Sequence, residues 1–349
     1  MIKLVDDPHV PWITRRQAAH TLGRIGISAR RAVPLLIQLL DEQEPRDQQP
    51  APCLWAIKAI ALFGPVAAEA TPALVKILNN ETARFEYRAG TIDALARIGT
   101  AHPLAIASLT DTLAQRPVNS TNEAARDANT LRELAANGIY VVGPAAASAV
   151  PALIRATRDE SESVRRKATL ALGAMGPRAE IAMPALVDLL GFDESAAVRD
   201  VAAKSLASIG AAAVSLLKKL LTDEDPAVRW RAAMALGQLR RLAISAVPAL
   251  RDATADVSPM VRMESIEALW RITGKADVVL PGLLETLTVA DRQVRIRAFR
   301  LLVQLGPQAL PAAGPLRRLL KDDRSYVRQV AKKALQTLEI EENVAQDPG

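Results

Sequence analysis

One pattern of apolar and polar positions recurs along this sequence. In the stretch that follows Asp159, apolar residues stand at relative positions 0, 4, 7, 8 and 11, which are Val164, Ala168, Ala171, Leu172 and Met175. At 100° per residue these positions share one side of a helix. A Gly176-Pro177 dipeptide follows, and then a second apolar stretch that carries Pro184 near its start. The pattern predicts a helix, a corner and a second helix.

The same unit is copied along most of the chain. The Arg that follows the first apolar residue recurs at Arg132, Arg165, Arg199, Arg229, Arg262, Arg295 and Arg328, in steps of 33, 34, 30, 33, 33 and 33 residues. A fixed period of about 20 to 50 residues is typical of repeat architectures. We therefore expect an all-α protein, a right-handed α-α superhelix (an α-solenoid) of about nine helix pairs. It should form a single solenoid over residues 1–338, with a frayed, acidic and flexible tail at 339–349.

Composition narrows the range of functions. Hydrophobic residues make up 50% of the chain but aromatic residues only 3%, so the core should consist of closely packed Ala, Leu, Val and Ile. Cys53 is the only cysteine, and no Cys/His spacing resembles a zinc site. We predict no cofactor and no metal. By inspection no apolar run approaches the ~20 residues that cross a bilayer. We therefore expect no membrane insertion and a cytoplasmic protein.

Charged residues recur at a fixed offset from one another. An Asp stands five residues before the first apolar position and the Arg stands one residue after it, so the two types alternate along the repeats. Such a set predicts a structural ladder of ion pairs, in which each Asp also caps the helix that it precedes. The predicted ladder consists of Asp159, Arg165, Asp193, Arg199, Asp223, Arg229, Asp256 and Arg262.

The repeated motif resembles that of a known family. The order Asp, Val-Arg, Ala-x-x-Ala-Leu-Gly, Gly-Pro and Val-Pro-Ala-Leu is similar to HEAT repeats, and specifically to the short HEAT-like repeats of phycobilisome bilin lyases. The resemblance covers residues 1–338. In HEAT solenoids the second helix of each pair lines the concave face. The resemblance thus implies that the Val-Arg helices are concave here and that the proline-bearing helices form the convex back.

Three adjacent repeats carry unusual residues at positions that point away from the buried stripe. A solvated face should be polar, yet these positions hold two Trp, two Met, one Phe and two Ile. Exposed apolar clusters often mark interaction sites, and aromatic residues and Met are enriched at interfaces. The predicted partner-binding groove consists of Trp230, Met234, Met263, Ile266, Trp270, Ile296 and Phe299, with Arg231 and Arg300 at its margin.

Several alternatives to a protein-binding groove remain open from the sequence. The same apolar residues would be core if these repeats curve more tightly. Basic residues such as Arg166 and Lys204 could contact nucleic acid, but Asp200 and Glu267 interrupt that surface. A bilin-lyase-like accessory enzyme has no compact motif to search for. We expect a non-catalytic scaffold or adaptor that binds another protein or peptide on its concave face. The pattern indicates neither the identity of the partner nor an oligomeric state.

Overall fold

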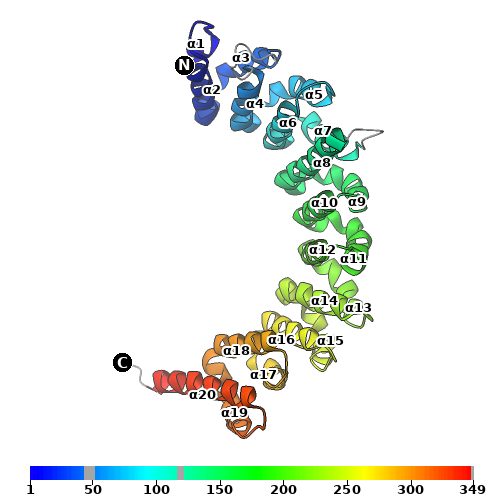
Figure 1. The fold of residues 1–349 in the computed structure, drawn as a ribbon, viewed down its shortest axis with the longest axis vertical. Helices are drawn as coiled ribbons and strands as arrows, with labels where there is room; N and C mark the ends of the chain where they lie inside the picture. The colour runs from blue at the N-terminus through cyan, green and yellow to red at the C-terminus, as the bar shows by residue number, and fades with distance from the viewer. Residues whose placement is uncertain (43–51, 116–121, 347–349) are drawn as a thin grey trace. The chain divides into compact units, whose positions relative to one another are not determined.

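A computed structural model describes residues 1–42, 52–115 and 122–346, and these residues form α-helices, 3₁₀ helices and connecting turns without a β-strand (Figure 1). Nine pairs of α-helices follow one another along the described chain, from α2 and α3 to α18 and α19. A short helix precedes the first pair and a long helix follows the last one. The fold is therefore the predicted all-α solenoid of repeated helix pairs.

The contacts divide the chain into two compact units, residues 1–186 and 187–349. The first unit contains the following α-helices: α1 (Ile2–Asp6), α2 (Trp12–Ile25), α3 (Val33–Leu39), α4 (Pro52–Phe63), α5 (Thr71–Asn79), α6 (Phe85–Ile98), α7 (Pro103–Ala114), α8 (Asn122–Val142), α9 (Val150–Ala156) and α10 (Glu162–Ala174). Its 3₁₀ helices are η1 (Gly26–Ala32), η2 (Gly64–Ala70), η3 (Gly99–Ala101), η4 (Gly143–Ala149) and η5 (Gly176–Ala182). The boundary between the units falls within α11 (Met183–Phe192).

The second unit continues the same alternation. Its α-helices are α12 (Ala196–Ile209), α13 (Val214–Leu220), α14 (Pro226–Leu239), α15 (Val247–Ala253), α16 (Pro259–Thr273), α17 (Ala276–Thr286), α18 (Arg292–Leu305), α19 (Ala313–Leu319) and α20 (Ser325–Gln346). Its 3₁₀ helices are η6 (Ala211–Ala213), η7 (Arg240–Ala246) and η8 (Gly306–Ala312).

The division into two compact units falls within the run of repeats, so the single solenoid over residues 1–338 stays a prediction. The predicted tail begins at Glu339. The backbone of α20 stays helical as far as Gln346, and residues 347–349 lie outside the described part of the chain.

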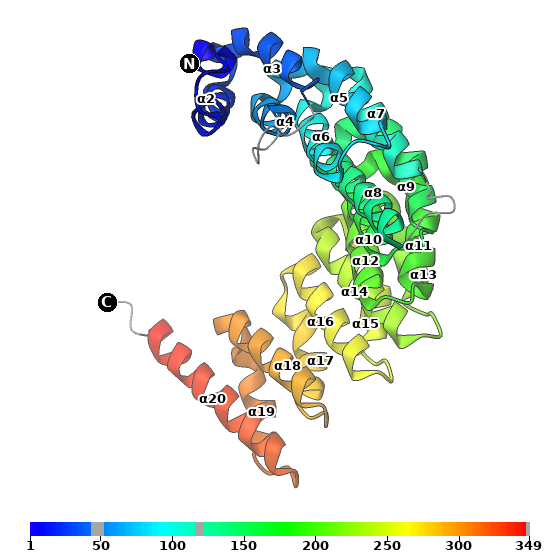
Figure 2. The ribbon, with the colours of Figure 1, turned by 45° about the horizontal axis from the view of Figure 1, so that its top comes forward.

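Within each unit the helices form two layers. In the first unit, α2, α4, α6, α8 and α10 pack side by side on the inner side of that unit's own curve (Figure 2). In the second unit, α12, α14, α16, α18 and α20 form the equivalent layer, while α13, α15, α17 and α19 lie on its outer side (Figure 1). The Val-Arg helices therefore form the inner layer of each unit.

The corner after each inner helix contains a residue with positive φ. This holds at all nine described corners, and eight of these residues are glycine, which adopts such angles without a steric penalty. At most corners a 3₁₀ helix follows, and several outer helices then begin with proline in their first turn, as in α9 and α15. The ninth corner is occupied by Arg240, with φ of 50° and ψ of −133°.

Small residues allow inner helices to approach one another closely. Gly237 stands nine positions after Val228 on α14. A Cβ atom added there would lie 2.9 Å from the Cα and 3.1 Å from the Cβ of Ala268 on α16. Gly23 occupies the same repeat position on α2 and faces Ala59 and Leu62 on α4 equally closely. The sparse aromatic content thus reflects helix packing that depends on Gly and Ala.

The ladder of charged residues connects each loop to the next helix. Each Arg donates from Nη1 to two carbonyl oxygens of the loop before its own helix. For Arg229 these acceptors are Asp223 and Glu224, both at 2.9 Å. Arg229 also forms a bidentate pair with Asp256 of the next repeat, at 2.7 and 2.8 Å. In the first unit Arg132 pairs with Asp159 of the next repeat through Nη1 alone, while its Nη2 donates to Asn129.

The remaining ladder residues show the loop contacts. Arg165 donates to the carbonyls of Asp159 and Glu160, Arg199 to those of Asp193 and Glu194, and Arg262 to those of Asp256 and Val257. The capping role expected for the Asp residues has to be corrected. Their side chains accept the backbone N–H two residues later in the loop, as Asp159 does from Ser161, because each Asp lies two residues before the helix N-cap.

Two helical stretches are long and apolar enough, by length and composition, to cross a membrane: Pro52–Asn79 and Ala124–Ala156. The expectation that no apolar run reaches this length therefore needs qualification. Each stretch is a helix, a 3₁₀ corner and a second helix of one repeat, and 61% and 44% of the respective apolar windows are buried inside the protein. In the second unit, α12 and α13 together pass the same test only as a pair bent by 117°.

Candidate partner-binding site

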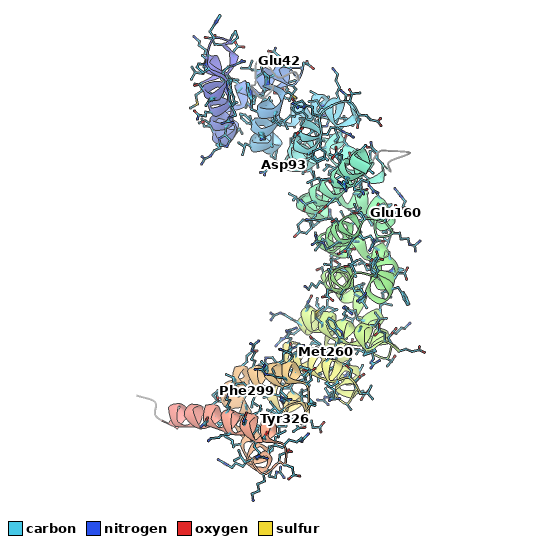
Figure 3. All side chains as sticks on the ribbon, in the orientation of Figure 1. Glu42, Asp93, Glu160, Met260, Phe299 and Tyr326 are labelled. Carbon is cyan, nitrogen blue, oxygen red and sulfur yellow. The ribbon has the colours of Figure 1, made fainter. Side chains whose placement is uncertain are left out.

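Most of the predicted groove lies on three neighbouring inner helices of the second unit. Trp230 and Met234 stand on α14, Trp270 on α16, and Ile296 and Phe299 on α18, and all five side chains are partly exposed. Helix α16 packs against both α14 and α18. Arg300 is exposed beside Phe299, which Figure 3 labels on α18. The structure therefore brings six of the nine predicted residues to one partly exposed surface, which we call the inner surface.

Three predicted groove residues are buried instead. Met263 and Ile266 have no exposed surface, and Arg231 is 4% exposed. The reason is that each inner helix packs against inner helices on both sides as well as against its outer helix, so its buried stripe is wider than the five positions used for the prediction. Met263 and Ile266 belong to the core. Arg231 is a structural residue whose Nε lies 2.7 Å from Asp200 and whose guanidinium lies 4.3 Å from the Trp230 ring centroid.

A pocket of about 580 Å³ opens on the same surface, next to Trp270. It is lined by Arg240 at the corner after α14, by Glu267, Trp270, Arg271 and Gly274 at the end of α16, and by Arg297, Arg300, Leu301 and Gln304 on α18. Trp270 occupies the repeat position that Gly237 holds on α14. A side chain of this size prevents the close approach seen between α14 and α16, which accounts for the space between α16 and α18.

A charged network forms one wall of this pocket. Arg297 on α18 donates to Glu264 at 2.6 Å and to Glu267 at 2.9 Å, both on α16. Glu267 also accepts from Arg271 at 3.1 Å. Glu264 is buried, and burial raises its pKa above the usual 4.5, although the positive charge and hydrogen bond of Arg297 oppose the shift. The network holds two carboxylates and two guanidinium groups, so its formal charge is zero.

Two arginines of the pocket stand outside this network. Arg240 and Arg300 are both exposed, and neither side chain makes a hydrogen bond or an ion pair with the described residues. The remaining charge of the pocket is therefore positive. Of the residues that line this pocket, the predicted groove includes only Trp270 and Arg300. Arg240 is nevertheless recognisable in the sequence, because it replaces the glycine expected at a repeat corner.

The first unit has a pocket of about 660 Å³ at a comparable place, between α2 and α4. Its lining includes Arg16, His20, Trp55 and Lys58. Trp55 is almost completely buried, and the Arg15 guanidinium lies 5.6 Å from its ring centroid. The repeat pattern does not predict this pocket, because the repeat that contains Trp55 departs from the Val-Arg pattern.

The single cysteine and the acidic residues offer little reactive chemistry. Cys53 is buried on α4, and burial, aided by the negative charge of Asp41, raises the pKa of its thiol to about 12. Among the described residues there is no group of three or more His, Cys, Asp or Glu side chains that could hold a metal ion. The described residues of the inner surface present apolar and cationic side chains.

Comparisons with known proteins identify the repeats. The family model for HEAT repeats matches residues 119–207, 183–270 and 214–289, and the model for the PBS lyase HEAT-like repeat matches residues 14–42. A search of curated proteins found no match.

Two solved structures are similar to this chain. An engineered protein, a target of the Northeast Structural Genomics Consortium, aligns with a TM-score of 0.40 at 22% identity over 97% of this chain and 98% of that chain. The complex of CpcE and CpcF of phycocyanin lyase from Nostoc sp. PCC7120 aligns with a TM-score of 0.36 at 25% identity over 44% of this chain and 97% of that chain. Neither score supports an inference about function.

Proposed function

Since this chain is a HEAT-repeat protein with short repeats of the phycobilisome lyase type, we propose that it is a non-catalytic scaffold or adaptor that binds a protein or peptide on the inner surface of its second unit. HEAT-repeat folds generally mediate protein interactions, and the proposal names the surface and the residues that do so here. The partner would meet the chain in the cytoplasm. Fold alone does not define function, so the proposal depends on the residues of the inner surface.

The observation that carries the proposal is the partly exposed apolar cluster on α14, α16 and α18. Trp230, Met234, Trp270, Ile296 and Phe299 come from three helices that are direct neighbours. Aromatic residues and Met are enriched at interfaces, because they bury a large area at a small cost in conformational entropy. Other exposed apolar residues, such as Phe192 at the end of α11 and Val257 in a loop, stand singly and need no such explanation.

The chemistry of the site favours binding over catalysis. The carboxylates of Glu264 and Glu267 are held by guanidinium groups, and the Cys53 thiol is buried away from the inner surface. A general base or a nucleophile has to be within reach of a substrate and in its reactive protonation state. The described residues of the inner surface offer hydrogen-bond donors and apolar contact area instead.

The test is affinity capture from the source cell lysate, with and without nuclease, followed by mass spectrometry. Wild type is compared with the double variant Met234→Glu/Phe299→Glu, which places two charges on the inner surface. Tyr140→Glu is the control, because Tyr140 lies on α8 of the first unit and its side chain is 44% exposed. We expect one protein partner that is captured by wild type and by the control and is lost in the double variant.

Circular dichroism and melting curves establish that each variant is folded before capture is interpreted. Capture that persists unchanged in a folded double variant would refute the inner surface as the binding site. Captured material that disappears on nuclease treatment would replace the proposal with nucleic-acid binding.

A further inference from the structure

We propose that the pocket beside Trp270 binds two adjacent carboxylate groups of an acidic peptide segment in the partner. This inference rests on the proposed function, because it names the chemistry that the inner surface recognises. It concerns a part of the surface that is cationic rather than apolar, so the peptide should carry apolar residues next to its acidic pair.

The charge of the pocket leads to this assignment. Arg271 and Arg297 are neutralised by Glu264 and Glu267, at distances of 2.6 to 3.1 Å. Arg240 and Arg300 line the same pocket from two different elements and have no partner among the described residues. Two uncompensated guanidinium groups match two carboxylates, and each can bind one of them through two parallel N–H···O bonds.

The backbone at Arg240 supports a functional role for this residue. Eight of the nine described corners use glycine at the positive-φ position, and Arg240 is the one non-glycine residue with positive φ among the described residues. An L-residue in this region is strained, and such strain concentrates at ligand-binding sites. The corner would be easier to form with glycine. An arginine there places an unpaired guanidinium at the mouth of the pocket.

The surroundings of the pocket determine which anion fits. Trp270 supplies an aromatic wall, and Phe299 adjoins Arg300 on α18, so apolar side chains on either side of the acidic pair would find contact area. The carboxylate of Glu267 forms part of the lining. Because Arg271 and Arg297 compensate this carboxylate, only Arg240 and Arg300 remain for a ligand, which suits a short acidic segment better than a continuous phosphate backbone. These features favour a peptide over a nucleic acid.

The experiment uses the full chain and a defined probe. The protein is labelled with ¹⁵N-tryptophan, which gives one indole N–H signal for each of the four Trp residues, and the Trp270 signal is assigned with Trp270→Phe. The probes are the peptide acetyl-Leu-Glu-Glu-Leu-amide and its Gln-Gln counterpart. We expect the Glu-Glu peptide to shift the Trp270 signal saturably, and the Gln-Gln peptide to leave it unchanged at the same concentration.

Substitutions then test which arginines bind the carboxylates of the Glu-Glu peptide. Arg240→Gly installs the residue found at the other corners, so the fold is preserved, and Arg300→Gln changes an exposed side chain. Each should weaken binding of the Glu-Glu peptide about tenfold, as expected for loss of one charged hydrogen-bonding group. The charge-matched control is Arg241→Gln, since Arg241 is exposed next to Arg240 but lines a different pocket with Ile244 and Lys275. The control should leave the affinity within twofold of wild type.

Three results of the peptide titrations would overturn the inference. The first is equal binding of the Glu-Glu and Gln-Gln peptides, and the second is equal loss of affinity in Arg241→Gln and Arg240→Gly. The third is a Trp270 shift with inorganic phosphate but none with the Glu-Glu peptide, which would assign the pocket to phosphate. The proposed function fails separately, because it requires capture of a partner that depends on Met234 and Phe299. A partner that is lost on changing these residues but retained by Arg240→Gly/Arg300→Gln would leave the scaffold role intact and refute only the carboxylate pocket.

Discussion

Two groups of arginines in the second unit illustrate how the same side chain serves structure or recognition. The ladder arginine Arg229 is 9% exposed and donates to two loop carbonyls and to both oxygens of Asp256. Arg240 at the corner after α14 and Arg300 on α18 have side chains with no partner among the described residues. Residue type alone does not distinguish these groups. The difference is whether the fold itself supplies acceptors for the guanidinium.

The largest effect should follow from breaking the ladder. Arg229→Ala removes the donors for two loop carbonyls and leaves the carboxylate of Asp256 unpaired, with its side chain only 12% exposed. Removing one partner of a fully buried pair costs about 3 to 5 kcal/mol, because an uncompensated charge remains, and this part-buried pair should reach the lower end of that range. We expect a loss of this size in the free energy of unfolding, measured by urea denaturation followed by circular dichroism.

A double variant separates the contribution of the ion pair to stability from the contribution of the loop contacts. Arg229→Ala/Asp256→Asn should recover part of the loss, because the unpaired charge is gone, whereas the loop carbonyls stay without their donor. The exposed Arg300→Ala should change the free energy of unfolding by less than about 0.5 kcal/mol. A cost for Arg300→Ala equal to that for Arg229→Ala would remove the distinction between the two groups.

The next effect tests why α14 and α16 pack closely while a pocket opens beside Trp270. Gly237→Ala would place a Cβ atom 2.9 Å from the Cα atom of Ala268, so one of the helices has to move. Overpacking of this kind costs about 1 to 3 kcal/mol. The matched control is Gly191→Ala on α11, where the nearest atom is Val228 Cγ2 at 4.0 Å. The control should be neutral or slightly stabilising, and an equal loss in both variants would contradict the packing argument.

A smaller effect of opposite sign is expected at the strained corner. Arg240→Gly relieves a backbone conformation that costs an L-residue about 1 to 3 kcal/mol, less the entropy that glycine loses on folding. We expect a net gain of about 1 kcal/mol and a higher melting temperature. A lower melting temperature would show that the Arg240 side chain stabilises the corner and is not held there at a cost.

Much of the fold could be predicted because every repeat has the same pattern of buried, corner and first-turn residues. The stripe that starts at Val164, the corner glycines and the first-turn prolines recur often enough to identify helix pairs without any long-range information. The exposure of individual residues was harder to predict. Met263 and Ile266 were placed on the surface because a single helix was considered, and the neighbouring inner helices that cover them enter only with the packed structure.

The pocket was missed for a related reason. It depends on the spacing of α16 and α18, which Trp270 increases and which no local pattern encodes. The unusual residue Arg240 was visible in the sequence as a missing glycine, but its meaning depends on the eight other corners. Each ladder Asp was predicted to cap the helix that follows it. It lies two residues before the N-cap instead, because the loop continues beyond the Asp before the helix begins.

The smallest expected effect is on the pH dependence of stability. The contributions of the Asp256 and Glu264 carboxylates to it should have opposite signs. Burial raises the pKa of Asp256, but hydrogen bonds from Arg229 and from the Ser258 N–H outweigh it, so the pKa lies below the usual 3.8. Its contribution to stability is present above pH 3.8 and is lost as the pH falls through the lowered value. The pKa of Glu264 lies above 4.5 because the group is buried. Its contribution is complete below pH 4.5 and is lost as the pH rises through the raised value.

Asp256→Asn should therefore remove a slope in stability below pH 3.8, and Glu264→Gln should remove a slope of opposite sign above pH 4.5. Urea midpoints measured from pH 3 to pH 7 provide the test, with Asp252→Asn as an exposed control on α15. Slopes of the same sign for the two carboxylates would mean that Arg297 compensates the burial of Glu264 fully. The carboxylates of the pocket network would then be as fully compensated as those of the ladder. The two regions would differ only in the unpaired side chains of Arg240 and Arg300.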